Sequence, residues 1–199
     1  MELDWNYFKS KLCNSPNNVQ IFEKTELASD LPRGNTAMEI IANSISFILV
    51  NKYLRILGTS DSLHENIFKF TGEFEEVFGE RKYIIANDIF GGLFASEKTI
   101  HYFSPDNLQW EDLGVNYEGF INWIAEKDIT DFYESFIWDG IDDLVSNVGS
   151  EQGIFIYPFL WAKECNVNTA FKKIVPYKDL LVANAQNMPL LAKETEEQN

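Results

Sequence analysis

The stretch from residue 83 to residue 113 constrains the fold of this chain more than any other. Short apolar runs alternate there with turn residues, which predicts four strands at 83–86, 93–95, 99–103 and 108–113. The connections between them are short, and Ser104-Pro105-Asp106-Asn107 has the composition of a turn. Strands joined in this way pair with their sequence neighbours in antiparallel fashion. The sequence therefore predicts an antiparallel β-meander.

Helical and strand patterns flank the meander on both sides. Residues 2–13 place Trp5, Phe8 and Leu12 at helical spacing. Further helices are expected at 36–42, 62–78, 117–124 and 177–185, and further strands at 19–22, 45–50, 53–57 and 153–157. Asn51-Lys52 is the expected hinge between two of these strands, and Gly58 ends the second. Thr130 is expected to cap one more helix, whose buried residues would be Phe132, Tyr133, Phe136 and Ile137.

These elements predict an α+β fold in which helices pack on one side of the antiparallel sheet. The chain has 45% hydrophobic and 15% aromatic residues, which is enough for a sizeable core. No repeat or low-complexity linker divides it, so residues 1–192 are predicted to form a single globular domain. Residues 193–199 are polar and charged and are expected to be a frayed acidic tail.

Acidic residues are concentrated in the middle of the chain. The formal net charge is −15, and residues 61–150 hold 19 acids against five bases, so this segment carries −14. Within it, residues 104–143 contain only one base, Lys127. Such a run is either a solvated surface or a negative patch that steers a basic partner towards it. The patch would consist of the acids Asp106, Glu111, Asp112, Glu118, Glu126, Asp128, Asp131, Glu134, Asp139, Asp142 and Asp143.

Charge and hydropathy also disfavour several classes of partner. Binding to nucleic-acid phosphates needs the opposite charge, so no nucleic-acid partner is expected. No apolar run reaches the roughly 20 residues that a bilayer span requires, so no membrane partner is expected. The N-terminus lacks the basic and apolar blocks of a signal peptide, which predicts a cytoplasmic protein. Cys13 and Cys165 could pair in an oxidising compartment, although two buried thiols are the commoner arrangement in a cytosolic protein.

The residues offer little catalytic chemistry. His64 and His101 are the only histidines, and the two cysteines lack metal-site spacing, so neither a metal nor another cofactor is expected. Nucleophile-elbow, phosphate-loop and dinucleotide motifs are missing from the sequence. Glu111 and Asp112 adjoin Trp110, as carboxylates adjoin aromatic rings in sugar-cleaving sites. Adjacent strand residues point to opposite faces, however, so these two cannot serve one site without a bulge. A carboxylate-based hydrolase or metal-dependent enzyme remains an alternative hypothesis.

Two tryptophans fall at the edges of their apolar faces. Trp123 and Trp138 are core residues on one interpretation and exposed interface anchors on another, because tryptophan is enriched at interfaces. If they are exposed, a structural or regulatory module that associates with itself is a third hypothesis.

Three sequence motifs between residues 84 and 138 together resemble the pattern of a known family. The strings from Ile84 to Ala95 and from Tyr102 to Leu113, followed by the aromatic spacing from Tyr117 to Trp138, resemble an uncharacterised bacterial domain-of-unknown-function family. The likeness covers most of residues 35–161. The sequence departs from the family pattern at Asn43-Ser44, where a glycine-rich turn is expected, and at Trp138-Asp139-Gly140, where Arg usually precedes the Trp.

The order of strand, glycine pair, strand and helix is similar, more remotely, to the SUKH superfamily of toxin-immunity proteins and yeast cell-wall regulators. That likeness rests on element order and implies a SUKH-like α+β fold with a binding role. The leading hypothesis is therefore a non-enzymatic, acidic, protein-binding domain, with a toxin-immunity protein that neutralises a basic toxin as its specific form.

Overall fold

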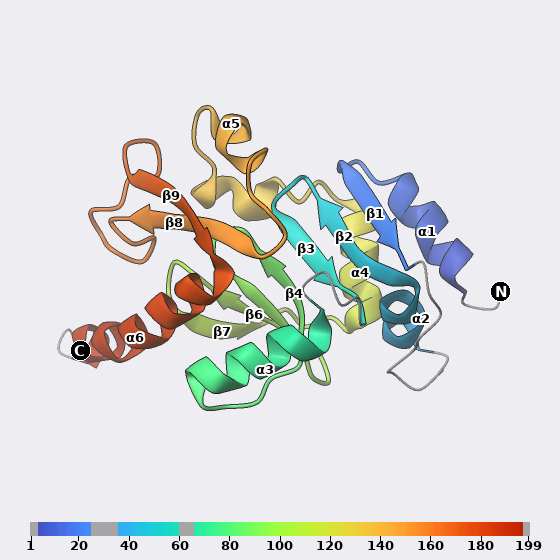
Figure 1. The fold of residues 1–199 in the computed structure, drawn as a ribbon, viewed down its shortest axis with the longest axis horizontal. Helices are drawn as coiled ribbons and strands as arrows, with labels where there is room; N and C mark the ends of the chain where they lie inside the picture. Colours follow the sequence, from blue (N-terminus) through green and yellow to red (C-terminus); the bar gives the residue numbers. More distant parts are fainter. Residues whose placement is uncertain (1–3, 25–35, 60–65, 197–199) are drawn as a thin grey trace.

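A computed structural model describes residues 4–24, 36–59 and 66–196. Its main feature is a seven-stranded antiparallel sheet in which every strand pairs with its sequence neighbour, in the order β1 to β7 (Figure 1). The α+β class and the β-meander are thus confirmed, and the meander extends three strands further towards the N-terminus than residues 83–113. The strands are β1 (Val19–Glu23), β2 (Ile45–Val50), β3 (Leu54–Leu57), β4 (Ile84–Asp88), β5 (Leu93–Ser96), β6 (Ile100–Ser104) and β7 (Gln109–Asp112).

The hinge between β2 and β3 is a tight turn, as its sequence predicts. Asn51 and Lys52 have φ values of 49° and 62°, and the N–H of Tyr53 donates to the carbonyl of Val50. Two successive residues with positive φ make a turn whose twist matches that of paired strands. Asn51 also accepts a hydrogen bond from the Asn18 N–H at 2.7 Å, which connects the turn to the segment before β1.

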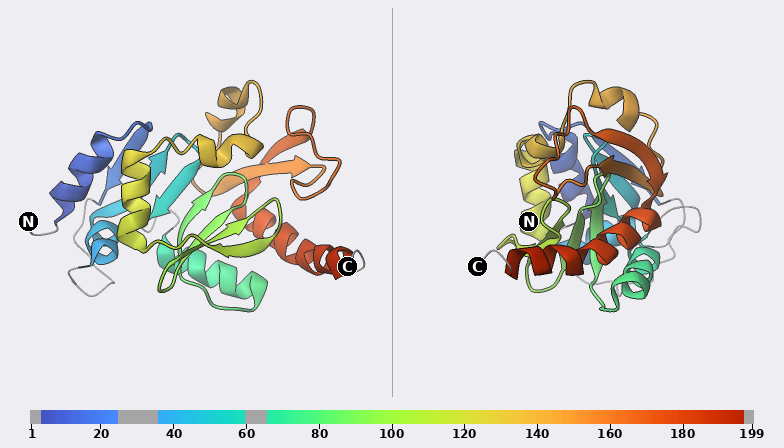
Figure 2. Two further views of the ribbon diagram at one scale, coloured as in Figure 1. Left: turned by 180° about the vertical axis from the view of Figure 1, so that it is seen from behind. Right: turned by 90° about the vertical axis from the view of Figure 1, so that its left-hand side faces the viewer.

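Helices cover both faces of the sheet, which corrects the expectation that they pack on one side (Figures 1 and 2). The helices α1 (Trp5–Cys13), α2 (Ala37–Ser44) and α4 (Tyr117–Glu126) gather on one face, and α3 (Ile67–Phe78) and α6 (Tyr177–Glu196) on the other. Strand β5 shows the reason, because its side chains alternate between the faces. Phe94 packs on Phe120 of α4, while Leu93 and Ala95 join the cluster around α3 and α6.

A separate two-stranded sheet follows the meander. It consists of β8 (Gln152–Tyr157), which was expected, and β9 (Phe171–Pro176), which was not. The N–H of Ile154 donates to the carbonyl of Ile89 at 2.7 Å and so joins this hairpin to the main sheet. Residues 158–170 connect the two strands. Helix α6 follows directly and packs against both strands and against α3.

Two helices differ from those expected, one in its type and its cap and the other in its length. The residues after Thr130 form a 3-10 helix, η1 (Asp131–Phe136), and the Thr130 side chain makes no capping hydrogen bond to it. Instead, Asp128 accepts the Thr130 N–H at 2.9 Å and closes the turn before η1. The short helix α5 (Ile141–Val145) comes next. Helix α6 runs to Glu196, so residues 193–196 are helical rather than frayed, and residues 197–199 lie outside the described part of the chain.

Candidate functional site

An apolar surface hollow of about 440 Å³ lies at the corner between α4 and η1. It is called the acidic groove below. Pockets of a few hundred cubic ångströms are the usual size for binding a side chain cluster or a small ligand. Its walls come from the β7–α4 connection, α4, the α4–η1 connection and η1. The lining residues are Leu113, Val115, Phe120, Trp123, Lys127, Asp128, Asp131 and Phe132.

The aromatic wall of the groove follows from the periodicity of α4. Asn116 caps this helix by accepting the Gly119 N–H at 2.9 Å. Phe120 then points into the core, and Trp123, three residues later, lies at the edge of the same face. The indole of Trp123 meets the ring of Phe132 edge to face at 5.4 Å. One side of Trp123 is thus packed, and the side chain remains half exposed to the groove.

Asn17, which the sequence does not single out, holds this corner together. Its side chain is buried, and its amide nitrogen donates to the carbonyls of Ile124 and Lys127 at 2.8 and 2.7 Å. Its amide oxygen accepts the Ile129 N–H at 3.0 Å. These bonds satisfy backbone groups that α4 leaves unpaired at its end. The segment that carries Asp128 and Asp131 is therefore positioned by a residue more than 100 positions earlier.

Replacing Asn17 by alanine is expected to lower the free energy of unfolding by about 2–3 kcal/mol, because the Ile129 N–H and the Lys127 carbonyl lose their side-chain partner and the Ile124 carbonyl keeps only the Ser15 hydroxyl. Asn18→Ala is the control, since Asn18 is exposed and its side chain makes no hydrogen bond among the described contacts; we expect a change within about 0.5 kcal/mol. Urea unfolding of the two variants measures the difference. Equal losses would show that Asn17 does not hold the corner.

Two carboxylates give the groove its negative charge. Asp128 accepts hydrogen bonds from the backbone N–H and the hydroxyl of Thr130, and these bonds lower the pKa of its carboxyl group. Asp128 is therefore ionised at neutral pH. It also borders a neighbouring polar hollow of about 410 Å³ that Asp142 lines. Lys127 lies on the groove as well, so the charges of the lining sum to −1.

The structure gathers only part of the eleven-residue acidic patch. All eleven side chains are exposed or half exposed, but they extend from the β6–β7 turn along β7, α4 and η1 to α5. Several have local partners: Asp106 accepts from Ser104, Glu111 accepts from Asn107, and Glu126 pairs with Lys11 at 3.4 Å. The groove brings together Asp128 and Asp131, and Asp142 lies across the adjoining hollow.

The two candidate interface tryptophans have different surroundings. Trp123 lines the acidic groove. Trp138 is only 8% exposed, and the ammonium group of Lys172 lies over its ring at 4.7 Å, so it does not offer a free face to a partner. The spacing that placed both at the edge of an apolar face could not show that β9 covers one of them.

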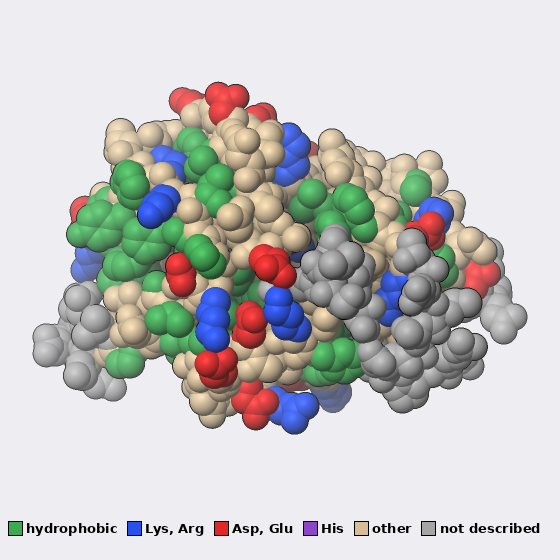
Figure 3. Space-filling view, in the orientation of Figure 1, with side chains coloured by type: hydrophobic (Ala, Val, Ile, Leu, Met, Phe, Trp, Pro, Cys, Tyr) green, Lys and Arg blue, Asp and Glu red, His purple; other side chains and the backbone are tan. Residues whose placement is uncertain are grey.

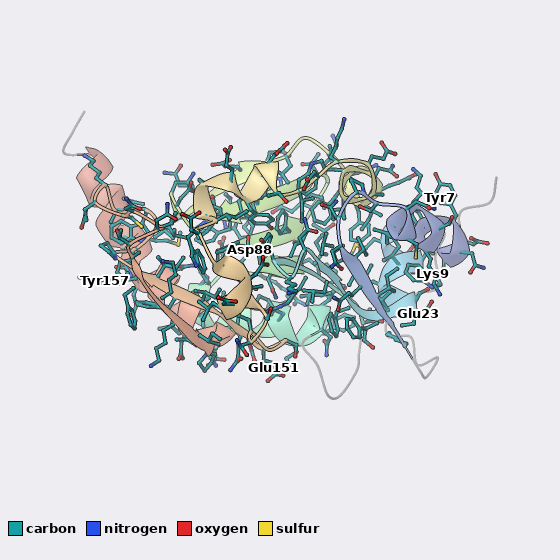
Figure 4. The ribbon with its side chains drawn as sticks, turned by 90° about the horizontal axis from the view of Figure 1, so that it is seen from above. Tyr7, Lys9, Glu23, Asp88, Glu151 and Tyr157 are labelled. Carbon is teal, nitrogen blue, oxygen red and sulfur yellow. The ribbon has the colours of Figure 1, made fainter. Side chains whose placement is uncertain are left out.

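Asp88 is not part of the eleven-residue acidic patch, and its side chain is fully buried. Figure 4 shows its position among the surrounding side chains. It accepts the N–H groups of Phe90 and Gly92 at 2.9 Å and the hydroxyl of Tyr102 at 3.0 Å. Burial raises the pKa of its carboxyl group to about 6. Tyr177 donates to the Gly92 carbonyl at 2.9 Å and so connects α6 to this turn. Asp88 organises the Gly91-Gly92 turn and does not open onto the groove.

The described parts of the chain do not bring together the other residues that the sequence offers for metal binding or catalysis. No three His, Cys, Asp or Glu side chains within residues 4–24, 36–59 and 66–196 gather closely enough to hold a metal ion. His101 lies in β6 beside Thr99 and Glu97, and His64 lies outside the described residues. Cys13 and Cys165 are free thiols, but neither is buried as expected, because Cys13 is exposed and Cys165 is half exposed. None of the helices that the structure describes is long and apolar enough to cross a bilayer.

Comparison with known proteins gives the class of this protein. The chain belongs to the family of proteins of unknown function DUF2625, whose family model matches residues 2–180. A curated relative is an uncharacterized protein of Escherichia coli (strain K12), YbfG; it is 30% identical over 150 residues, which are 71% of this chain and 68% of the relative. No solved structure matches the chain significantly. The resemblance to a family of unknown function is thereby confirmed.

Proposed function

We propose that this protein binds a basic segment of a protein partner in the acidic groove. The observation that carries the proposal is the composition of the groove: an apolar floor with a half-exposed tryptophan, bordered by two carboxylates. The charged group of a lysine or arginine side chain can make a cation–π contact with an indole ring and also form an ion pair with a carboxylate. Apolar neighbours of that side chain would fill the remaining volume against Leu113, Val115 and Phe132.

The charge of the chain supports the same proposal. The groove lies within the segment 104–143, which holds 11 acids and one base. A negative surface of this extent accelerates encounters with a basic partner and makes them sensitive to salt. The specific form that we propose is an immunity protein for a basic toxin, supported by the similarity in element order to the SUKH superfamily. A gene for a large toxin with a basic C-terminal domain directly upstream would favour this form.

Acid–base catalysis is less well supported. Asp128 and Asp131 do line one groove, which is the arrangement a carboxylate-based hydrolase would need. A general acid at neutral pH needs a raised pKa, whereas hydrogen bonds from Thr130 lower the pKa of Asp128. A low pKa suits a permanently charged binding group.

A labelled, tryptophan-free peptide of alternating Arg and Leu residues tests the proposal by fluorescence anisotropy. We expect binding that weakens as salt is added. Trp123→Ala should weaken it about 30-fold, the size of an interface anchor worth about 2 kcal/mol. Asp128→Asn/Asp131→Asn should weaken it several-fold, since each exposed charge pair is worth up to about 1 kcal/mol.

The matched control removes the same charge from α3, which lies on the opposite face of the sheet, and from the segment directly after that helix. Glu73→Gln/Glu80→Gln should leave peptide binding close to that of the wild type. If the control loses as much affinity as the groove variant, the peptide responds to net charge alone and the groove is not the site.

A further inference from the structure

A second apolar surface lies at the free end of the β8–β9 hairpin. Tyr157 and Phe171 are cross-strand neighbours there and are 56% and 61% exposed, the highest values among the large hydrophobic residues described. Phe159 lies 5.8 Å from Tyr157 and stacks on Trp161 at 5.2 Å. These four residues form the aromatic patch, and hydrophobic side chains gather over this end of the molecule in Figure 3. Contiguous exposed apolar residues of this kind mark interaction sites.

The aromatic patch has a basic border in an otherwise acidic protein. Residues 152–176 contain three lysines and one glutamate, a net charge of +2, whereas the whole chain carries −15. Lys173 follows Phe171 by two residues and therefore lies on the same face of β9. Lys163 is exposed in the connection that also contains Phe159 and Trp161. Lys172 belongs to the other face, where it covers Trp138.

This basic, aromatic surface is complementary to the acidic groove. One presents tyrosine and phenylalanine rings with lysines, and the other presents an apolar hollow with Asp128 and Asp131. The hairpin end and α4 lie well apart in Figure 1 and in the left panel of Figure 2, which both show the molecule with its longest axis horizontal. One chain therefore does not place its own patch in its own groove. A contact between patch and patch would instead set lysines against lysines.

We propose that the aromatic patch of one copy docks into the acidic groove of a second copy. Tyr157 and Phe171 act as the anchors, and Lys163 and Lys173 lie against the groove carboxylates. Because the two surfaces differ, the contact is heterologous and produces rings or open chains. The inference rests on the proposed function, since it names a second copy of this chain as a partner of the same groove.

Sedimentation velocity on two variants tests the contact. The patch variant is Tyr157→Ser/Phe171→Ser, and the groove variant is Trp123→Ala/Asp131→Lys. We expect the mean mass of the wild type to rise with concentration, whereas each variant alone keeps the mass of one chain. An equimolar mixture of the two variants should form a species of two chains, because each supplies the surface that the other lacks.

The control is Phe68→Ser, an exposed position on α3 outside both surfaces, which should associate like the wild type. Melting curves confirm that each variant is folded. A wild type that keeps the mass of one chain at all concentrations overturns the inference. So does a groove variant that associates alone, or a mixture that forms no dimer. Sedimentation of the wild type, but not of the patch variant, with phosphatidylserine vesicles would assign the patch to a membrane surface and also overturn it.

The Arg-Leu peptide separates this inference from the proposed function. The patch variant keeps the groove intact and should bind the peptide with wild-type affinity. If it does, while the wild type fails to associate, only the contact between copies is wrong. If the peptide also fails to bind, both proposals fall.

Discussion

Replacing Asp88 by alanine is expected to lower the free energy of unfolding by about 3–5 kcal/mol. The change leaves the N–H groups of Phe90 and Gly92 and the hydroxyl of Tyr102 buried without their acceptor, and each such loss costs about 1–3 kcal/mol. The Gly91-Gly92 turn then loses its anchor, and with it the contact that Tyr177 makes from α6. Urea unfolding measures the loss.

Asparagine at position 88 separates the hydrogen bonds from the charge. Its amide oxygen can accept the same two N–H groups, so Asp88→Asn should stay within about 1 kcal/mol of the wild type at acid pH. The carboxyl pKa is raised from 3.8 to about 6 in the folded protein, so folding favours the neutral acid. That contribution is fully present below about pH 4 and is lost as the pH rises through about 6.

The asparagine variant has no such titration. The difference in unfolding free energy, variant minus wild type, should therefore rise with pH between about 4 and 7, by up to about 3 kcal/mol. Taking the difference cancels the effects of the many exposed carboxylates that both proteins share. A difference that is flat over this range, or that falls with pH, would contradict the burial of an ionisable Asp88.

Gly58→Ala is the second substitution for which we expect a large effect. Gly58 follows β3, and a Cβ atom there would overlap the carbonyl oxygen of Ile45 and lie 2.7 Å from that of Ser46. Both are backbone atoms of β2, which cannot move without breaking the pairing of β2 with β3. We expect a loss of about 3 kcal/mol or more, the upper range for overpacking.

Gly72→Ala is the matched control for that change. Gly72 lies in the interior of α3, and an added Cβ would have no described atom within 4 Å. Alanine should stabilise the protein there by about 0.5–1 kcal/mol, because glycine is a poor helix former. If thermal unfolding shows similar effects at both positions, the close approach of β2 to Gly58 is not a determinant of the fold.

Much of the fold can be predicted from local patterns. Turn residues and apolar runs between 83 and 113 define four strands of the meander, and the Asn51-Lys52 hinge defines a hairpin, because these signals depend on neighbouring residues only. The sequence does not predict strand β9, since Lys172 and Lys173 interrupt its apolar pattern. Its pairing with β8 across a connection of 13 residues is a non-local interaction. The sequence likewise predicts a helix after Thr130 but does not indicate that it is a 3-10 helix at 131–136.

Less of the candidate site than of the fold can be predicted from the sequence. The sequence indicates Asp128, Asp131 and Trp123 only as members of a long acidic run and of an aromatic series. Their neighbours in space were not predictable, because Asn17 fixes the end of α4 from a distant segment. Trp138 had the same sequence signal as Trp123, yet Lys172 covers it. The aromatic patch also needed β9 to bring Phe171 beside Tyr157.

The sequence by itself determined the α+β class, the antiparallel meander and the position of the negative charge along the chain. Each of these depends on composition and on spacing within a few residues. Only the tertiary structure decided that helices cover both faces of the sheet, that Asp88 is buried, and which acids share a groove. Such properties depend on contacts between segments that are distant in sequence, and a periodic pattern carries no information about which distant segment will cover a given face.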